Sequence, residues 1–190
     1  GGGGFMVVRD RDGKACTYDF REEAPAASHP EMFTQDGRYD ERRHHDSPVS
    51  VGVPGTVAGL YQAWKDRGHL PWKRLVEPAL RLSSDGITVS QPLSDSLKEF
   101  EKELKPHRGT RKAFFKPDGR PYERGERLRQ PELARTLGRI ATLGADGFYR
   151  GTTARLLVAE MNRGGGLITR SDLASYRPRI REVLRGSYRG

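Results

Sequence analysis

The chain is organised around one short stretch of sequence, Tyr18-Asp19-Phe20-Arg21-Glu22-Glu23-Ala24-Pro25. A predicted strand leads into it, because Ala15, Thr17 and Phe20 lie among polar neighbours. The strand ends before Pro25, which lacks a backbone N–H donor and biases the preceding residue towards an extended conformation. The stretch therefore presents a single arginine, Arg21, at the mouth of a sheet.

Arg21 is the candidate binding residue of the chain. A guanidinium is always charged, and its planar fork pairs with a carboxylate through two parallel hydrogen bonds. Such a group is suited to holding an amino-acid substrate by its α-carboxylate. An ordinary ion pair with Asp19, Glu22 or Glu23 is the other interpretation, and it is the one that these residues alone favour.

Other motifs accompany this stretch in a definite order along the chain. They are Gly1-Gly2-Gly3-Gly4-Phe5-Met6-Val7-Val8, Asp19-Phe20-Arg21-Glu22, Val51-Gly52-Val53-Pro54-Gly55-Thr56-Val57-Ala58-Gly59-Leu60, Leu70-Pro71-Trp72, Glu77-Pro78-Ala79-Leu80-Arg81-Leu82, Gly147-Phe148-Tyr149-Arg150-Gly151, Gly165-Gly166-Leu167-Ile168-Thr169, Asp172-Leu173-Ala174-Ser175-Tyr176 and Tyr188-Arg189-Gly190. Together they closely resemble the large-subunit region of the γ-glutamyltranspeptidases. The resemblance is weakest over residues 35–46 and 106–129.

The resemblance implies a fold. Members of this family are N-terminal-nucleophile hydrolases, so we expect a mixed α/β (α+β) structure that forms part of a four-layer αββα sandwich. Residues 1–190 would be an incomplete large-subunit region, with residues 106–129 as an insertion-like segment. The glycines at residues 1–4 would mark a close approach of backbone segments, because they lack the Lys-Ser/Thr of a phosphate-binding loop.

The resemblance also implies a reaction. The family cleaves γ-glutamyl amides, such as glutathione, with an N-terminal threonine whose own α-amine serves as base. Water, an amino acid or a peptide then accepts the glutamyl group. By motif match, Arg21 binds the α-carboxylate of the substrate. The expected partners are a small-molecule γ-glutamyl substrate and the small subunit of the same precursor, with no cofactor.

No catalytic residue is expected within the chain. The family nucleophile lies in a Thr-Thr-His context, whereas Ala154 follows Thr152-Thr153 here. We interpret these threonines as helix-capping residues. Ser28, Ser47 and Ser83 occupy no nucleophile elbow. The 190 residues alone are therefore expected to be inactive.

Charge allows a different function. The formal net charge is +9, which is compatible with binding nucleic acid or an acidic surface. Positive residues are nevertheless scattered among acids, and we expect no nucleic-acid partner. The alternatives are a non-catalytic basic module that binds an anionic polymer through Arg108, Arg111, Lys112 and Lys116, and an acylase of the same fold that acts on another amide.

Other classes of site find little support. His29, His44 and His45 lie in a loop-like region without the spacing of metal ligands, so we expect no metal site. Cys16 is the only cysteine, which excludes an intrachain disulfide. No apolar run approaches the roughly 20 residues that span a bilayer. Without an initiator methionine the sequence is interpreted as an excised piece of a longer polypeptide, whose family resemblance favours a periplasmic or extracellular location.

Periodicity and turn residues predict the elements. The first half of the chain is predicted to contain a hairpin of residues 5–9 and 15–20 turning at Asp12-Gly13, a loop over 24–48, a buried strand over 50–53, and a helix over 57–66 capped by Thr56 and stopped by Gly68. A helix from Pro71 to Gly86 follows, with Leu75, Ala79 and Leu82 on one face, and Pro78 should break or restart it. The remaining predictions are helices over 92–105 and 152–162, a helix between them that opens at residues 130–132 and is capped by Gly144, a short helix ending at Tyr176 with a Thr169/Asp172 capping box, and a closing strand over 180–188.

Overall fold

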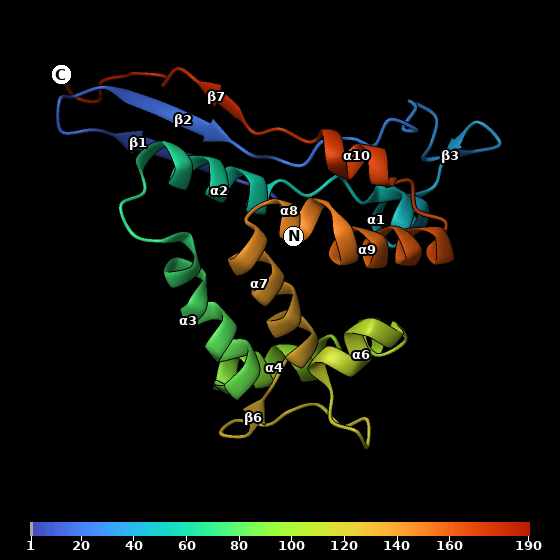
Figure 1. Ribbon diagram of the computed structural model, residues 1–190. Coiled ribbons are helices and arrows are strands. Elements are labelled where there is room, and N and C mark those ends of the chain that lie inside the picture. Colours follow the sequence, from blue (N-terminus) through green and yellow to red (C-terminus); the bar gives the residue numbers. More distant parts are fainter. Residues whose placement is uncertain (1) are drawn as a thin grey trace. The chain divides into compact units, whose positions relative to one another are not determined.

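The computed structural model describes residues 2–190. The contacts divide the chain into two compact units. One unit contains the residues up to Trp72 together with Leu143–Gly190, and the other contains Lys73–Thr142 (Figure 1). Both units combine helices with short strands, which confirms the predicted mixed α/β class.

The first unit contains an antiparallel sheet in the order β1-β2-β7 (Figure 1). Its strands are β1 (Phe5–Arg9), β2 (Ala15–Asp19) and β7 (Arg179–Arg181). The predicted hairpin is confirmed, and its turn uses Gly13 at a positive φ of 87°. The prediction of a strand to residue 188 was wrong beyond Arg181. Leu184 and Tyr188 are 103% and 83% exposed, so the segment buries little apolar surface that would hold it against the sheet.

The helix α2 (Thr56–Arg67) lies along the sheet (Figure 1), where Tyr18 of β2 is completely buried. Its N-cap is Gly55, so the prediction that Thr56 caps it was wrong. The carbonyl of Gly2 instead accepts the N–H groups of Gly55 and Thr56, at 2.7 and 3.2 Å. This backbone approach satisfies two N–H groups at the start of α2, and it confirms the interpretation of the N-terminal glycines for Gly2, whereas Gly1 lies outside the described residues.

The segment before α2 is less regular than predicted. Only an isolated bridge between Glu23 and Val53 replaces the expected strand over 50–53, and η1 (Pro48–Ser50) is a 3-10 helix. Pro48 and Pro54 flank residues 49–53 and lack the N–H donors that a continuous β-ladder needs.

The predicted loop over 24–48 contains short regular elements. A small hairpin pairs β3 (Thr34–Gln35) with β4 (Arg38–Tyr39), and α1 (Glu41–His45) follows it. Asp40 caps α1 by accepting the N–H of Arg43 at 2.9 Å. The loop prediction was therefore wrong over these residues. Their short elements are determined by turn and cap signals that span only two or three residues each.

Three helices complete the first unit: α8 (Asp146–Tyr149), α9 (Gly151–Gly164) and α10 (Arg170–Ser175). The prediction of α9 is confirmed, and Gly165 ends it in the left-handed region. The capping box at the start of α10 is also confirmed, with reciprocal bonds between Thr169 and Asp172. Leu173, on the same helix, is completely buried.

The second unit is mainly helical. Its elements are α3 (Trp72–Asp85), β5 (Ile87–Thr88), α4 (Gln91–Glu99), α5 (Glu101–Leu104), α6 (Arg108–Phe114), β6 (Arg127–Leu128) and α7 (Pro131–Leu143). The prediction of α7 is confirmed, whereas the helix predicted over 92–105 divides into α4 and α5 at Phe100. Strand β6 pairs with β5, and Phe115 and Leu128 are both 3% exposed, so residues 106–129 contribute to the core of this unit.

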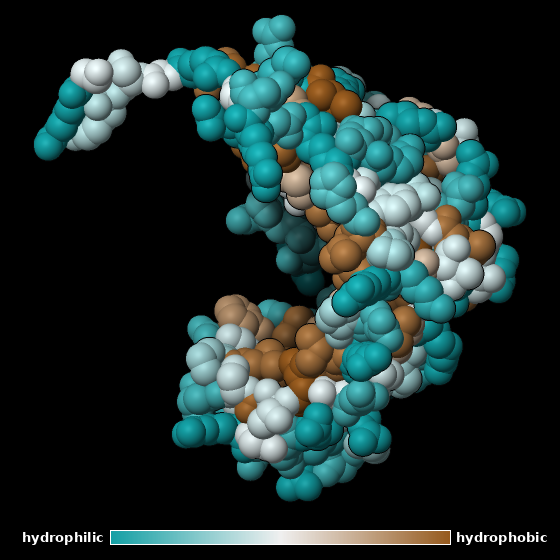
Figure 2. Space-filling view, turned by 60° about the vertical axis from the view of Figure 1, so that its left-hand side comes forward, coloured by the Kyte–Doolittle hydropathy of each residue, from teal (hydrophilic) through white to brown (hydrophobic). Residues whose placement is uncertain are grey.

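Helix α3 continues through Pro78, so the predicted break was wrong. Pro78 is exposed, which lets water bind the carbonyl that the missing N–H leaves unpaired. The buried face of α3 is formed by Val76 and Ser83, whereas Leu75 and Leu82 are 47% and 57% exposed. Hydrophobic groups also interrupt the mostly hydrophilic face of the molecule in Figure 2.

The capping carboxylate of Asp172 allows a test of stability against pH. Burial raises its pKa, but hydrogen bonds from Thr169 and from the N–H of Ala26 outweigh burial and hold the pKa below the ordinary 3.8. This stabilisation is complete above pH 3.8 and is lost as the pH falls through the lower pKa of the folded state. We expect Asp172→Asn to lower the free energy of unfolding by about 1 kcal/mol at pH 7.

Urea unfolding at pH 7 and pH 3 measures this effect, with Glu99→Gln at an exposed position as the control. The difference between wild type and Asp172→Asn should shrink at pH 3. An equally large difference at both pH values would contradict the role of the ionised carboxylate.

Candidate functional site

Arg21 follows directly after β2, and backbone contacts hold its position. Phe20, the preceding residue, exchanges two backbone hydrogen bonds with Gly4, at 2.9 and 3.2 Å. The N–H of Arg21 donates to Asp19 Oδ1 at 3.2 Å, and its carbonyl accepts the hydroxyl of Tyr176 at 2.8 Å. The main chain is thus anchored while the side chain remains 61% exposed.

Tyr176 connects Arg21 to the core of the first unit. Its ring is 5% exposed and stacks on Tyr149, with the centroids 5.8 Å apart and the planes 5° from parallel. The Tyr149 hydroxyl donates to the carbonyl of Pro54 at 2.7 Å and accepts the N–H of Ala58 at 3.3 Å. The position of Arg21 therefore depends on residues from α2, α8 and the end of α10.

Both tyrosines remain protonated near neutral pH. Burial, assisted by the negative charges of Glu23, Asp19 and Glu22, raises the pKa of Tyr176 to about 12. Burial also raises the pKa of Tyr149. The hydroxyl of Tyr176 is therefore a permanent donor to the Arg21 carbonyl over the working range of most enzymes.

The Arg21 side chain borders a cleft of about 210 Å³, which we call the Arg21 cleft. It is lined by Asp19, Arg21, Glu22, Glu23, Tyr176, Arg179 and Arg181. The Nε atom of Arg21 lies 3.4 Å from the Glu22 carboxylate. The ion pair considered in the sequence analysis thus exists, but it is long and leaves most of the guanidinium in contact with solvent.

Two further ion pairs cross the Arg21 cleft from β7. Arg181 Nε donates to Asp19 Oδ2 at 2.7 Å, and Arg179 Nη2 donates to Glu23 Oε1 at 2.9 Å. The hydrogen bond from Arg181 is the main reason that the pKa of Asp19 is lowered. The three arginines and three carboxylates that line the cleft balance in charge. Among them, the guanidinium of Arg21 can bind a small carboxylate.

Sequence reasoning found Arg21 but missed its neighbours Tyr176, Arg179 and Arg181. They lie more than 150 positions away in the chain. The pairing of β7 with β2 brings the two arginines to the site, whereas Tyr176 is held there by its hydrogen bond to the Arg21 carbonyl and by its stacking on Tyr149. The alternation Arg179-Ile180-Arg181 was the available signal, because it places both arginines on one face of a strand.

The two threonines that resembled a nucleophile lie in the first turn of α9. The hydroxyl of Thr153 donates to the carbonyl of Gly147 at 2.6 Å, and the residue is 8% exposed. The N-cap of α9 is Arg150, without a capping bond from its side chain, so the capping interpretation was wrong. Thr153 instead joins α9 to α8.

Other candidate groups have structural partners. Among residues 2–190, no cluster of three or more His, Cys, Asp or Glu is arranged to hold a metal ion. His44 Nδ1 lies 2.6 Å from the Tyr39 hydroxyl. Within the same described range, none of the helices combines the length and apolar character needed to cross a membrane.

The basic residues of the alternative binding module are partly neutralised. Lys112 pairs with Glu132, and Lys116 pairs with Glu126 at 3.0 Å. Arg108 and Arg111, on α6, are exposed. Half of the proposed polymer-binding cations thus have a carboxylate partner within their own unit.

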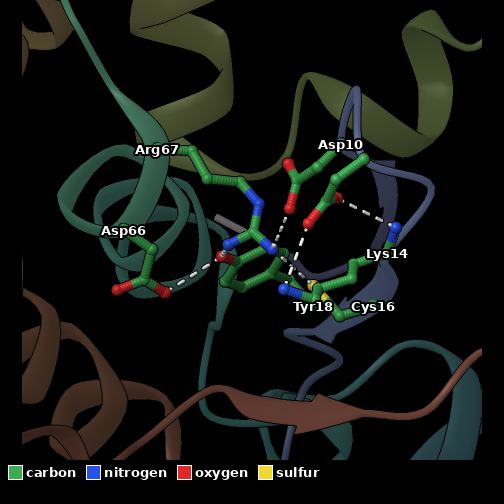
Figure 3. Close-up of polar contacts among 7 residues, drawn as sticks. Asp10, Lys14, Cys16, Tyr18, Asp66 and Arg67 are labelled. Carbon is green, nitrogen blue, oxygen red and sulfur yellow. Dashed lines mark hydrogen bonds and ion pairs between the residues drawn. The ribbon is translucent and has the colours of Figure 1, made fainter.

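Cys16 belongs to a polar cluster between β2 and α2 (Figure 3). Arg67 donates to Cys16 Sγ at 3.3 Å, to Asp10 Oδ2 at 3.2 Å and to the Tyr18 hydroxyl at 2.8 Å. The Tyr18 hydroxyl donates to Asp66 at 2.9 Å, and burial together with Asp66 raises its pKa to about 12. This cluster attaches α2 to the sheet, and none of its residues lines the Arg21 cleft.

The anchoring role of Tyr176 can be tested by Tyr176→Phe. The variant keeps the stacked ring but loses the donor to the Arg21 carbonyl, which costs about 0.5–1.5 kcal/mol. We expect weaker binding of a carboxylate ligand and a small loss of stability, measured by calorimetry and thermal unfolding. Tyr188→Phe, at an 83% exposed position, is the control, and equal ligand affinity in all three proteins would contradict this role.

The structure is similar to the crystal structure of Helicobacter pylori γ-glutamyltranspeptidase, with a TM-score of 0.97 and 39% identity, over all of this chain and 55% of that chain. It is also similar to γ-glutamyltranspeptidase from Pseudomonas nitroreducens complexed with L-DON, with a TM-score of 0.86, 38% identity and the same coverage. The mixed helices and strands thus form part of an N-terminal-nucleophile hydrolase fold.

The family follows from the sequence match. The family model described as gamma-glutamyltranspeptidase matches residues 1–190, and the chain belongs to that family. The chain is 42% identical to the glutathione hydrolase proenzyme of Escherichia coli K12, over 100% of this chain and 33% of that relative. It therefore spans about a third of the length of the curated relative.

Proposed function

We propose that the chain is large-subunit sequence of a γ-glutamyltransferase or glutathione hydrolase. The complete enzyme would cleave γ-glutamyl amides and transfer the glutamyl group to water, an amino acid or a peptide. The observation that carries this proposal is the anchored backbone and exposed guanidinium of Arg21 at the Arg21 cleft. Membership of the γ-glutamyltranspeptidase family over residues 1–190 supports the same assignment.

In this proposal Arg21 binds the α-carboxylate of the glutamyl group. Its planar fork donates two parallel charge-assisted hydrogen bonds, which together favour the correct acyl group by about 1.5–3 kcal/mol. Tyr176 fixes the backbone from which the side chain extends. The arginine then orients the donor, so that its γ-carbonyl faces a nucleophile supplied by another part of the protein.

The proposed nucleophile is an N-terminal threonine outside residues 1–190. Its own α-amine would accept the hydroxyl proton as the oxygen attacks the amide carbonyl. The C–N bond would then break, the departing amine would take up that proton, and the glutamyl group would remain as an ester of the threonine. Thr152 and Thr153 are unsuited to this role, because they lie inside α9 and carry no free α-amine. The printed name proenzyme of the Escherichia coli relative supports a precursor of this kind.

The small subunit of the same precursor is the proposed partner. Phe5 and Val7 of β1 are 61% and 69% exposed, whereas Tyr18 on the opposite face of the sheet is buried. In a four-layer αββα sandwich, helices cover one face of each sheet and the other sheet covers the opposite face. Helix α2 covers the face of the sheet that carries Tyr18. The exposed Phe5 and Val7 on the opposite face support docking of further sheet structure there.

Turnover of a γ-glutamyl anilide tests the proposed function. The complete reading frame that contains this chain should release the aniline, and the purified 190-residue chain should not. Turnover by the 190-residue chain would place the nucleophile inside it and overturn the assignment. A complete protein that binds no γ-glutamyl compound but shows salt-dependent binding to DNA would instead favour the basic module.

A further inference from the structure

The carboxylates next to Arg21 in the chain raise a difficulty for its proposed role. Asp19, Glu22 and Glu23 all lie within two positions of it. Each can form an ion pair with the guanidinium and so compete with the carboxylate of a ligand. A binding arginine in such a sequence needs something that keeps these acids occupied.

Strand β7 supplies two cations at this point. Its antiparallel register places Arg179 opposite Asp19 and Arg181 opposite Thr17, so both arginines lie on the same face of the sheet as Asp19. Arg179 binds Glu23 at 2.9 Å, and Arg181 binds Asp19 at 2.7 Å. Two of the three competing acids are thereby bound by arginines other than Arg21.

The remaining acid makes only a weak contact. Glu22 approaches Nε of Arg21 at 3.4 Å, and within residues 2–190 neither Nη atom of Arg21 donates a hydrogen bond to a carboxylate. The two Nη atoms can bind a ligand carboxylate end-on, through two parallel hydrogen bonds. The three arginines and three carboxylates of the cleft balance in charge, whereas removing both β7 arginines would leave an excess of two negative charges.

We propose that Arg179 and Arg181 are positioning residues of the Arg21 cleft. They bind Glu23 and Asp19 and thereby keep the Nη atoms of Arg21 available to the α-carboxylate of the acyl donor. This inference rests on the proposed function, because it gives a role to residues around the same binding arginine. Neither β7 arginine needs to touch the substrate.

The decisive experiment is a double-mutant cycle in the complete enzyme, with a γ-glutamyl anilide as donor. Arg179→Gln frees Glu23 to compete for Arg21, and we expect KM to rise about two- to fivefold while kcat changes little. Adding Glu23→Gln to this variant removes the competitor and should return KM to the wild-type value. Arg81→Gln, which breaks the exposed pair with Glu77 on α3, should leave KM unchanged.

The outcomes separate the inference from the function. If Arg21→Lys raises KM but Arg179→Gln does not, the inference is wrong and the proposed function stands. If the double variant keeps the raised KM, Arg179 acts by contact or by structure, and the inference is also wrong. If Arg21→Lys leaves both kinetic constants unchanged, the proposed binding site itself fails.

Folding and catalysis are controlled separately. The thermal midpoint of each variant shows whether a KM change accompanies unfolding. Calorimetric binding of L-glutamate repeats the cycle without requiring turnover, and the same pattern of loss and recovery is expected in its dissociation constant.

Discussion

Replacing Arg21 by lysine is expected to raise KM for a γ-glutamyl donor about 10- to 100-fold in the complete enzyme, which corresponds to about 1.5–3 kcal/mol. Lysine keeps the positive charge but lacks the planar fork that binds a carboxylate through two parallel hydrogen bonds. The expected loss comes from geometry. The hydrogen bond from Tyr176 anchors the backbone at residue 21, so the backbone does not shift to bring the shorter lysine side chain to the ligand carboxylate. Initial rates over a range of donor concentrations measure it.

A change of donor separates this role from a general loss of structure. With a donor that lacks the α-carboxylate, wild type and Arg21→Lys should have similar kcat/KM, since neither side chain then has its partner. Arg163→Lys, on α9 and paired with Glu160, is the matched control. Unchanged KM and kcat for Arg21→Lys with the full γ-glutamyl donor would show that Arg21 pairs only with its neighbours.

Local signals predicted the parts of the fold that depend on a few adjacent residues. The hairpin around Gly13, the end of α2 at Gly68 and the capping box at Thr169 all follow from turn or capping residues. Helix α7 follows from its apolar period. The residues that determine these elements lie within or next to them in the sequence, so a single sequence suffices to predict them.

Two errors concern helices whose local signals were present but did not decide the structure. Thr56 has the right side chain for a cap, but α2 begins with Gly55 as its N-cap, and the distant Tyr149 hydroxyl accepts the N–H of Ala58 at 3.3 Å. At this end of α2 the tertiary setting outweighs the local preference. Pro78 has the right chemistry for a break, but α3 continues through it at an exposed position, where water can bind the carbonyl left unpaired.

The candidate site divides in the same way. Arg21 stands out in the sequence because of its motif, whereas Tyr176 and the β7 arginines become visible only through the pairing of strands far apart in the chain. Their side chains resemble ordinary surface arginines and a core tyrosine. Nothing in their immediate sequence indicates that they surround Arg21.

Two glycine-to-alanine changes inside helices should have opposite effects on stability. Helix propensity alone favours alanine at both positions by about 0.5–1 kcal/mol. At Gly138 of α7 a new Cβ would meet only Leu80 Cδ1, at 3.7 Å, so Gly138→Ala should stabilise the protein by roughly that amount. Gly138→Ala therefore serves as the matched control for the more crowded position.

At Gly59 of α2 a Cβ would lie 2.2–2.4 Å from Cγ, Cδ1 and Cβ of Phe20, which is 6% exposed. Phe20 has no open space to enter, so we expect Gly59→Ala to lower the free energy of unfolding by about 1–3 kcal/mol or more despite its better helix propensity. Because Phe20 precedes Arg21, the displaced ring should also raise KM for a γ-glutamyl donor. Urea unfolding of both variants measures the two signs, and stabilisation by Gly59→Ala would mean that α2 does not pack closely on the segment that carries Arg21.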